Sequence, residues 1–204
     1  MIARRLADRR RSGARGQGLV EFAVLVPVFF LLLLGMLEFG LAYTHDQTLA
    51  YATREGARAG AALGVGNSSY PCNTPNFDAP IVAAVERILE SPGSPITIAN
   101  VQSIKIYLAN AAGNPTGSVN NWALAIGGGP VVDGKPLDFI QTTSGWNPCA
   151  RNNGVNADAL GVSLSYTYQF ETPFGGIIKL VSGSNWTSLQ MTDKTVMNLN
   201  PTVQ

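Results

Sequence analysis

The chain has 204 residues and a formal net charge of +1, and 46% of its residues are hydrophobic. That composition excludes an intrinsically disordered chain. The charge is unevenly placed, because residues 1–16 hold six arginines and one aspartate, a net +5. The remaining residues hold eight basic and twelve acidic side chains, a net −4. A mildly acidic body disfavours nucleic-acid binding, so we expect no nucleic acid among the partners.

An apolar run follows the arginines. No charged residue occurs from Phe22 to Leu37, and Glu21 and Glu38 bracket the run. With its flanks it reaches the roughly 20 residues that a membrane-spanning helix needs, and it has no polar face to suggest a surface helix of a globular core. Arginine-rich flanks stay in the cytoplasm. We therefore expect a single-pass helix with the N-terminus inside and everything after Tyr43 outside.

A cleaved secretory signal peptide is the main alternative to a membrane anchor. It would also begin with basic residues and an apolar stretch, and small residues suited to cleavage occur at 40–42 and 50–52. However, the run is longer than the apolar part of a typical signal peptide, and Glu38 and Phe39 interrupt the approach to the first site. The sequence therefore favours the anchor.

The segment GQGLVEFAVLVPVFFLLLLGMLEFGLAY, followed by ATREGARAGA, resembles the TadE-like family of the tight-adherence pilus system. The specific part covers residues 16–61. Gly16 is followed after four residues by Glu21 and an aromatic residue, here Phe22 where Flp-type sequences usually have tyrosine. The resemblance implies that a prepilin peptidase cuts between Gly16 and Gln17 on the cytoplasmic side, which makes Glu21 the fifth residue of the mature chain.

The resemblance also implies an assembly role for Glu21 and Phe22. In the pilin family, the glutamate at this place pairs with the freed N-terminal amine of a neighbouring subunit. A buried charge is tolerable when it is paired and hydrogen-bonded, and losing its partner costs several kcal/mol, so such a pair would select the register of assembly. The alternative is that Glu21 only stabilises the N-terminal end of a helix dipole at the membrane interface.

We expect the helix to run from Gln17 to about Leu63, with Pro27 as either a hinge or a tolerated kink. Small residues recur every four positions in its outer half. Glycine costs about 1 kcal/mol of helix propensity relative to alanine, so this ridge indicates close approach by another element, either the chain's own sheet or a neighbouring helix. The last glycine is also expected to end the helix. The ridge consists of Ala52, Gly56, Gly60 and Gly64.

The expected domains are a basic cytoplasmic leader (1–16), a transmembrane and stalk helix (17–64) and an extracytoplasmic head (65–204). In the head, an amphipathic helix over 77–90 should begin with Asp78 as its N-cap. Alternating apolar residues predict antiparallel strands. These lie at 101–108, 160–170 and 186–199, the last with a turn or bulge near Asp193.

The Gly-, Asn- and Pro-rich region 110–157 is predicted to form long loops with one short strand near 122–126. The apolar face of the head's sheet needs a cover, and the outer half of the long helix is the natural one. The predicted fold class is therefore α+β: a long N-terminal membrane-spanning helix packed on an antiparallel β-sheet head, as in type IV pilins.

Cys72 and Cys149 are the two cysteines of the chain. An even number outside the membrane favours one disulfide; two unpaired thiols are the alternative. Chain entropy predicts a gain of roughly 4 kcal/mol for a bridge across a loop of this size.

The sequence carries no pattern of an enzyme. A single histidine, His45, cannot form a His-pair metal site, and no nucleophile elbow is present. A calcium-binding site in the loop flanked by Asp133 and Asp138 is the least favoured of the possible ligand sites. We therefore predict a non-enzymatic protein without catalytic, metal or cofactor sites.

The resemblance implies a TadE-like pseudopilin or minor pilin, a structural component of a tight adherence (type IVc) pilus that acts in pilus assembly and surface adhesion. Its expected partners are the prepilin peptidase, other pilin or pseudopilin subunits, the inner-membrane assembly platform and the lipid bilayer. Its expected location is the cell membrane, with incorporation into an extracellular pilus as a further expectation. The alternative is a membrane-anchored extracytoplasmic binding module or adhesin, suggested by polar loops around Trp122 and Trp146.

Overall fold

The structure is a computed structural model that describes residues 2–183 and 187–200. The first element, α1 (Ile2–Leu63), continues through Pro27 without a break. It begins well before the expected start at Gln17 and ends where expected. The chain divides into two compact units, each made of two segments. Unit 1 contains Met1–Leu41 and Phe170–Thr187, and unit 2 contains Ala42–Gln169 and Ser188–Gln204.

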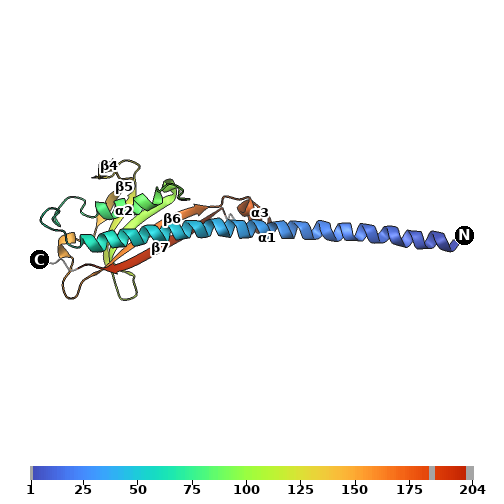
Figure 1. The fold of residues 1–204 in the computed structure, drawn as a ribbon, viewed down its shortest axis with the longest axis horizontal. Helices are drawn as coiled ribbons and strands as arrows, with labels where there is room; N and C mark the ends of the chain where they lie inside the picture. The colour runs from blue at the N-terminus through green and yellow to red at the C-terminus, as the bar shows by residue number, and fades with distance from the viewer. Residues whose placement is uncertain (1, 184–186, 201–204) are drawn as a thin grey trace. The chain divides into compact units, whose positions relative to one another are not determined.

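Unit 2 is built on a five-stranded antiparallel sheet with the strand order β5-β2-β1-β6-β7 (Figure 1). A short 3-10 helix precedes the first main strand, and a two-stranded hairpin and a second 3-10 helix lie between later ones. The five strands are β1 (Val101–Ala109), β2 (Pro115–Leu124), β5 (Phe139–Ser144), β6 (Ala159–Gln169) and β7 (Ser188–Asn198). The hairpin is β3 (Val131–Val132) with β4 (Lys135–Pro136), and the 3-10 helices are Ile98–Asn100 and Pro148–Ala150.

The core of unit 2 lies between this sheet and two helices. Alternation along β6 places five side chains in the core, as the sequence predicts: Leu160, Val162, Leu164, Tyr166 and Tyr168. The C-terminal part of α1 and α2 (Ala79–Leu89) run beside each other in Figure 1, and both contribute fully buried side chains. The α+β layout of a long apolar helix followed by an antiparallel sheet is confirmed.

Two expectations about the strands need correction. Region 110–157 holds two full strands of the main sheet, β2 and β5, rather than one short strand among loops. β5 lies at the edge of the sheet and β2 is half-exposed. Both strands therefore carry polar side chains, which obscure the alternation of apolar and polar residues. The bulge near Asp193 is absent, because β7 pairs with β6 in unbroken register from Ser188 to Asn198. Trp186, the expected start of that strand, lies outside the described residues.

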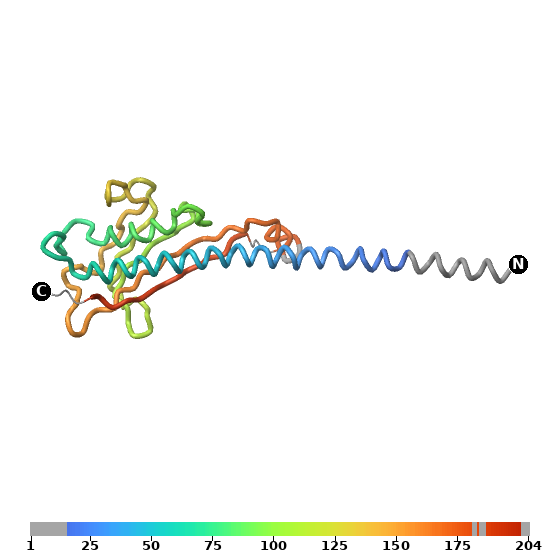
Figure 2. The backbone as a smooth tube through the Cα atoms, viewed as in Figure 1, coloured from blue at the N-terminus to red at the C-terminus, as the bar shows by residue number. Residues whose placement is uncertain are grey.

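Unit 1 combines the N-terminal part of α1 with the segment Phe170–Thr187. That segment contains a helix that the sequence analysis did not predict, α3 (Phe174–Ser182). Figure 2 shows the tube of this segment beside α1. A β-carbon added at Gly35 would lie 3.3 Å from the ring of Phe174, so the glycine allows α3 to approach α1 closely.

Candidate assembly surface

The residues around the expected cleavage site lie on exposed turns of α1. Gly16, Gln17, Glu21 and Phe22 are all exposed, the last with 68% of its surface accessible. Gln17 and Glu21 are one helical turn apart, and Gln17 Nε2 donates a hydrogen bond to Glu21 Oε1 at 3.1 Å. Because the carboxylate is at the surface, a cation from another chain has access to it.

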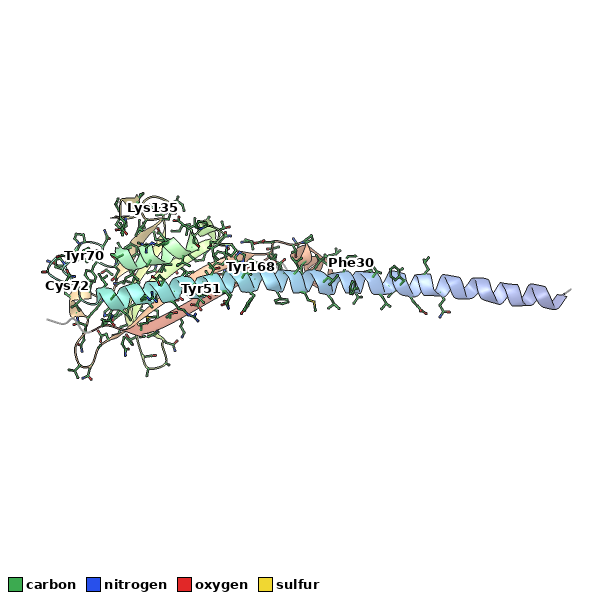
Figure 3. The ribbon with its side chains drawn as sticks, viewed as in Figure 1. Phe30, Tyr51, Tyr70, Cys72, Lys135 and Tyr168 are labelled. Atoms are coloured by element: carbon green, nitrogen blue, oxygen red, sulfur yellow. A yellow bond between two sulfur atoms is a disulfide. The ribbon has the colours of Figure 1, made fainter. Side chains whose placement is uncertain are left out.

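The helix beyond these residues presents apolar side chains outward. In the described part of the chain, one helix, Gly16–Leu63, is long and apolar enough to cross a membrane, and 6% of its most apolar 18-residue window is buried. A core helix of a soluble protein would be mostly covered, whereas Figure 3 shows Phe30 projecting outward from the helix. This arrangement fits a single-pass membrane anchor. The large exposed side chains include Val24, Leu25, Phe29, Phe30, Leu32 and Met36.

The glycine ridge of α1 packs inside the chain. Ala52 is fully buried. A β-carbon at Gly56 would lie 2.6 Å from Val85 Cγ2 of α2, and one at Gly60 would lie 2.7 Å from Leu160 Cδ2 of β6. Gly64 has φ +55° and donates its N–H to the Gly60 carbonyl at 3.1 Å, so it ends the helix. The ridge therefore contacts elements of its own chain, α2 and β6.

Another face of the same turns of α1 remains accessible and borders a groove of about 570 Å³. The Arg58 guanidinium lies 3.7 Å from Glu55, and the Arg54 guanidinium lies 6.0 Å from the centre of the Tyr51 ring. The end of α2 and the loop after it form the opposite wall, together with Met197 of β7. Two arginines and one glutamate of α1 therefore line an open groove of unit 2.

A buried polar cluster holds the loop after β5 against the start of α2. Asp78 is at the predicted N-cap position, but its side chain makes no capping hydrogen bond. Its Oδ2 instead accepts from Arg151 Nη2 and from Asn120 Nδ2, both at 2.7 Å. The Arg151 guanidinium also lies 4.4 Å from the Trp146 ring centre. The ion pair is buried, at 0% and 1% side-chain exposure, so it serves the fold rather than a ligand.

The Cys72–Cys149 disulfide is present, which confirms the expected bridge. It joins the loop before α2 to the 3-10 helix that precedes Arg151, and its half-cystines are 77 residues apart. The bridge and the Asp78–Arg151 ion pair therefore fix the same two segments to each other. The ion pair escaped sequence reasoning because its partners are 73 residues apart and neither belongs to a motif.

Glu38 is the principal residue of unit 1 that sequence reasoning left without a role. Glu38 is only 3% exposed, although its side chain ends in a carboxylate. It accepts hydrogen bonds from the backbone N–H groups of Glu171 at 3.0 Å and Thr172 at 2.9 Å, and from the Thr172 hydroxyl. These donors compensate the carboxylate for its loss of water. They also fix the chain just before α3.

His45 is 2% exposed. Its ring stacks on the Tyr166 ring with 5.8 Å between the centroids and makes an edge contact with the Tyr168 ring with 4.8 Å between the centroids. Its place is therefore in an aromatic cluster of unit 2. In the residues that the structure describes, no group of three or more His, Cys, Asp or Glu side chains is arranged to hold a metal ion. Asp133 faces Arg87 at 3.7 Å, while Asp138 Oδ1 accepts from the N–H of Gly127.

Comparison with known families identifies the N-terminal part of the chain. Residues 16–58 match the family model described as TadE-like protein. The match covers the expected cleavage motif, the apolar run and the first two residues of the glycine ridge, Ala52 and Gly56, and it confirms the resemblance to the TadE-like family. No curated protein and no solved structure matches the chain.

Proposed function

We propose, from the match of residues 16–58 to the TadE-like family, that this chain is a pseudopilin or minor pilin of a tight adherence (type IVc) pilus. One observation carries the proposal: the matched segment is a helix whose apolar side chains face outward and whose C-terminal turns are built into a folded α+β unit. A subunit of this kind anchors in the bilayer before assembly and packs against other helices afterwards. The proposed role is structural, in pilus assembly and surface adhesion, and not enzymatic.

The proposed division of the chain follows from this role. Residues 1–16 form a basic cytoplasmic leader, residues 17–64 the transmembrane and stalk helix, and residues 65–204 the extracytoplasmic head. The proposed partners are a prepilin peptidase, other pilin or pseudopilin subunits, the inner-membrane assembly platform and the lipid bilayer. The protein lies in the cell membrane with its N-terminus in the cytoplasm and later enters the extracellular pilus.

In the proposed mechanism, cleavage between Gly16 and Gln17 creates a charged amine one helical turn from Glu21. The Glu21 carboxylate is exposed and accepts from Gln17 Nε2 at 3.1 Å. Once the segment is in the low-dielectric interior of a helix bundle, an amine from a neighbouring chain gives a stronger interaction than an amide does. Pairing with the neighbour's Gln17 amine then fixes the axial register of two subunits.

The experiment that tests this function is mass spectrometry of the mature N-terminus in cells with and without an active prepilin peptidase. We expect Gln17 as the first residue only when the peptidase is active. A chain that begins at Met1 in both strains, or at Tyr43, would contradict the proposal.

The pairing role is tested separately by Glu21→Ala and by the matched control Glu55→Ala on the same helix. We expect Glu21→Ala to be cleaved and retained in the membrane but to be lost from crosslinked assemblies. Glu55→Ala should assemble normally, because Glu55 lies beyond the membrane segment and faces Arg58 of its own chain. Unchanged assembly of Glu21→Ala would exclude the pairing.

A further inference from the structure

The segment Phe170–Thr187 belongs to the same compact unit as the apolar part of α1, although it is far away in the sequence. Three hydrogen bonds to Glu38 hold its beginning, and the Phe174 ring covers Gly35. The rings of Phe170 and Phe174 are 6.3 Å apart and pack against each other. The contacts place the start of α3 beside residues 35–38 of α1.

Those residues mark one end of the uncharged run. Glu21 and Glu38 are separated by about 26 Å along a helix axis, at 1.5 Å per residue, which is close to the roughly 30 Å thickness of the hydrocarbon core. If Glu21 lies at the cytoplasmic interface, Glu38 lies at the outer one. Because Phe174 packs on Gly35, one turn closer to the bilayer centre than Glu38, α3 begins at the outer boundary of the hydrocarbon core.

The composition of α3 suits that depth. Its sequence is FGGIIKLVS, with one charged residue, Lys179. Leu180 is 87% exposed and Lys179 is also exposed, whereas Ile177 is partly covered. The neighbouring side chains of α1 are exposed and apolar as well, with Met36 at 73% and Phe39 at 72%.

We propose that α3 is an interfacial helix that lies in the outer leaflet of the membrane, with Leu180 at the boundary of the acyl chains and Lys179 among the lipid phosphates. The occupant is a lipid surface because the exposed apolar side chain of Leu180 belongs to the same compact unit as the exposed apolar side chains of Met36 and Phe39 on α1. A short apolar helix with a cation at its edge is of the kind that binds in the plane of the interface. This inference rests on the membrane anchoring in the proposed function.

The arrangement gives the anchor a fixed depth. Without α3, a single helix is free to slide along the bilayer normal until its charged ends resist. With α3 attached through Glu38, sliding inward would bury Lys179, and sliding outward would expose Leu180 to water. Glu38 thereby couples the depth of the helix to a second, independent contact with lipid.

The test uses the full chain in vesicles of phosphatidylcholine and phosphatidylglycerol. Leu180→Cys is labelled with an environment-sensitive fluorophore; the native cysteines are joined in the disulfide and do not compete. The substitution leaves the packing intact because Leu180 is exposed. The matched control is Val155→Cys in unit 2, where the side chain is fully exposed.

We expect the probe at residue 180 to show blue-shifted emission, quenching by lipids with a nitroxide near the headgroup, and loss of quenching by aqueous iodide. The probe at residue 155 should show no blue shift, no quenching by lipid nitroxides, and full quenching by aqueous iodide. If the two probes behave alike, the inference is wrong. It is also wrong if residue 180 is protected from both iodide and lipid nitroxides, since protein would then cover it, as a second copy of the chain would.

A third probe separates failure of the inference from failure of the anchoring. Leu32→Cys lies within the uncharged run, where its side chain is 59% exposed. Quenching at residue 32 by nitroxides deep in the bilayer, without lipid quenching at residue 180, would overturn the interfacial helix alone. Absence of lipid quenching at residue 32 would overturn the membrane anchoring and the interfacial helix together.

Discussion

Glu38 accepts hydrogen bonds from both the backbone N–H and the hydroxyl of Thr172, a residue 134 positions later in the chain. The carboxylate therefore does for unit 1 what a cap does for a helix end: it satisfies donors that precede α3. It also explains how an acid is tolerated at the end of the apolar run of α1, since three hydrogen-bond donors contact the carboxylate.

Replacing Glu38 with glutamine should release the segment that carries α3. The amide has one acceptor oxygen in place of two, so one donor at Glu171 or Thr172 is left facing an N–H group. Hydrogen bonds to charged groups are worth about 1.5–3 kcal/mol, and we expect hydrogen exchange at these two amides to accelerate by roughly 10- to 100-fold. Glu21→Gln on the exposed part of the same helix is the control and should leave their exchange unchanged. Equal protection in Glu38→Gln would show that the carboxylate does not hold the segment.

Enlarging Gly56 should destabilise unit 2. A β-carbon there already meets Val85 Cγ2 at 2.6 Å, so Gly56→Leu overpacks the contact between α1 and α2. Overpacking costs about 1–3 kcal/mol, which should lower the thermal midpoint measured by circular dichroism of the full chain in detergent. Gly40→Leu is the control, because a β-carbon there has no neighbour within 4 Å. Adding Val85→Ala to Gly56→Ala should recover stability that Gly56→Ala loses; no recovery would mean that Val85 is not the obstacle.

Removing the arginine of the buried ion pair should lower the free energy of unfolding far more than removing an arginine at the surface. Arg151→Met leaves the Asp78 carboxylate buried with the Asn120 amide still donating to it, and an uncompensated buried charge costs about 3–5 kcal/mol. Arg87→Met removes an exposed pair with Asp133 and should cost less than about 1 kcal/mol. Denaturant unfolding of the two variants in detergent measures the difference. Similar midpoints would mean that the buried pair contributes no more than a surface contact.

Glu86 should make unit 2 less stable as the pH rises. Burial raises the pKa of this carboxyl from 4.5 to about 7, against the opposing effect of the hydrogen bond from the Asp138 N–H at 2.8 Å. The folded state then binds more protons than the unfolded state between pH 4.5 and about 7, so stability falls across that window, by about 3 kcal/mol at most.

Glu86→Gln keeps an oxygen that accepts from Asp138 but no longer titrates. We expect it to flatten the pH dependence of thermal unfolding and to be more stable than the unsubstituted chain at pH 8. Glu55→Gln, a change at an accessible carboxylate, should keep the original slope. A wild-type stability that rises from pH 5 to pH 7 would contradict a neutral buried Glu86.

The sequence by itself determined the features that depend on local patterning. The uncharged run after the arginines predicted a long apolar helix of the length and hydropathy of a membrane anchor, and the structure has such a helix. The alternation from Leu160 to Tyr168 determined a half-buried strand, since successive side chains of a strand face opposite sides. The combination of motifs across residues 16–61 carried the family resemblance.

Only the tertiary structure decided the features that join distant segments. The partners of the glycine ridge, the pairing of Asp78 with Arg151, and the attachment of α3 to Glu38 all link residues whose separation leaves no local trace. β5 and most of β2 were missed for the same reason, although the short strand predicted near 122–126 overlaps the end of β2. The pairing of these strands with their neighbours stabilises them more than their own composition does. The physical cause is that burial and hydrogen bonding are properties of the assembled fold, whereas periodicity is a property of the chain.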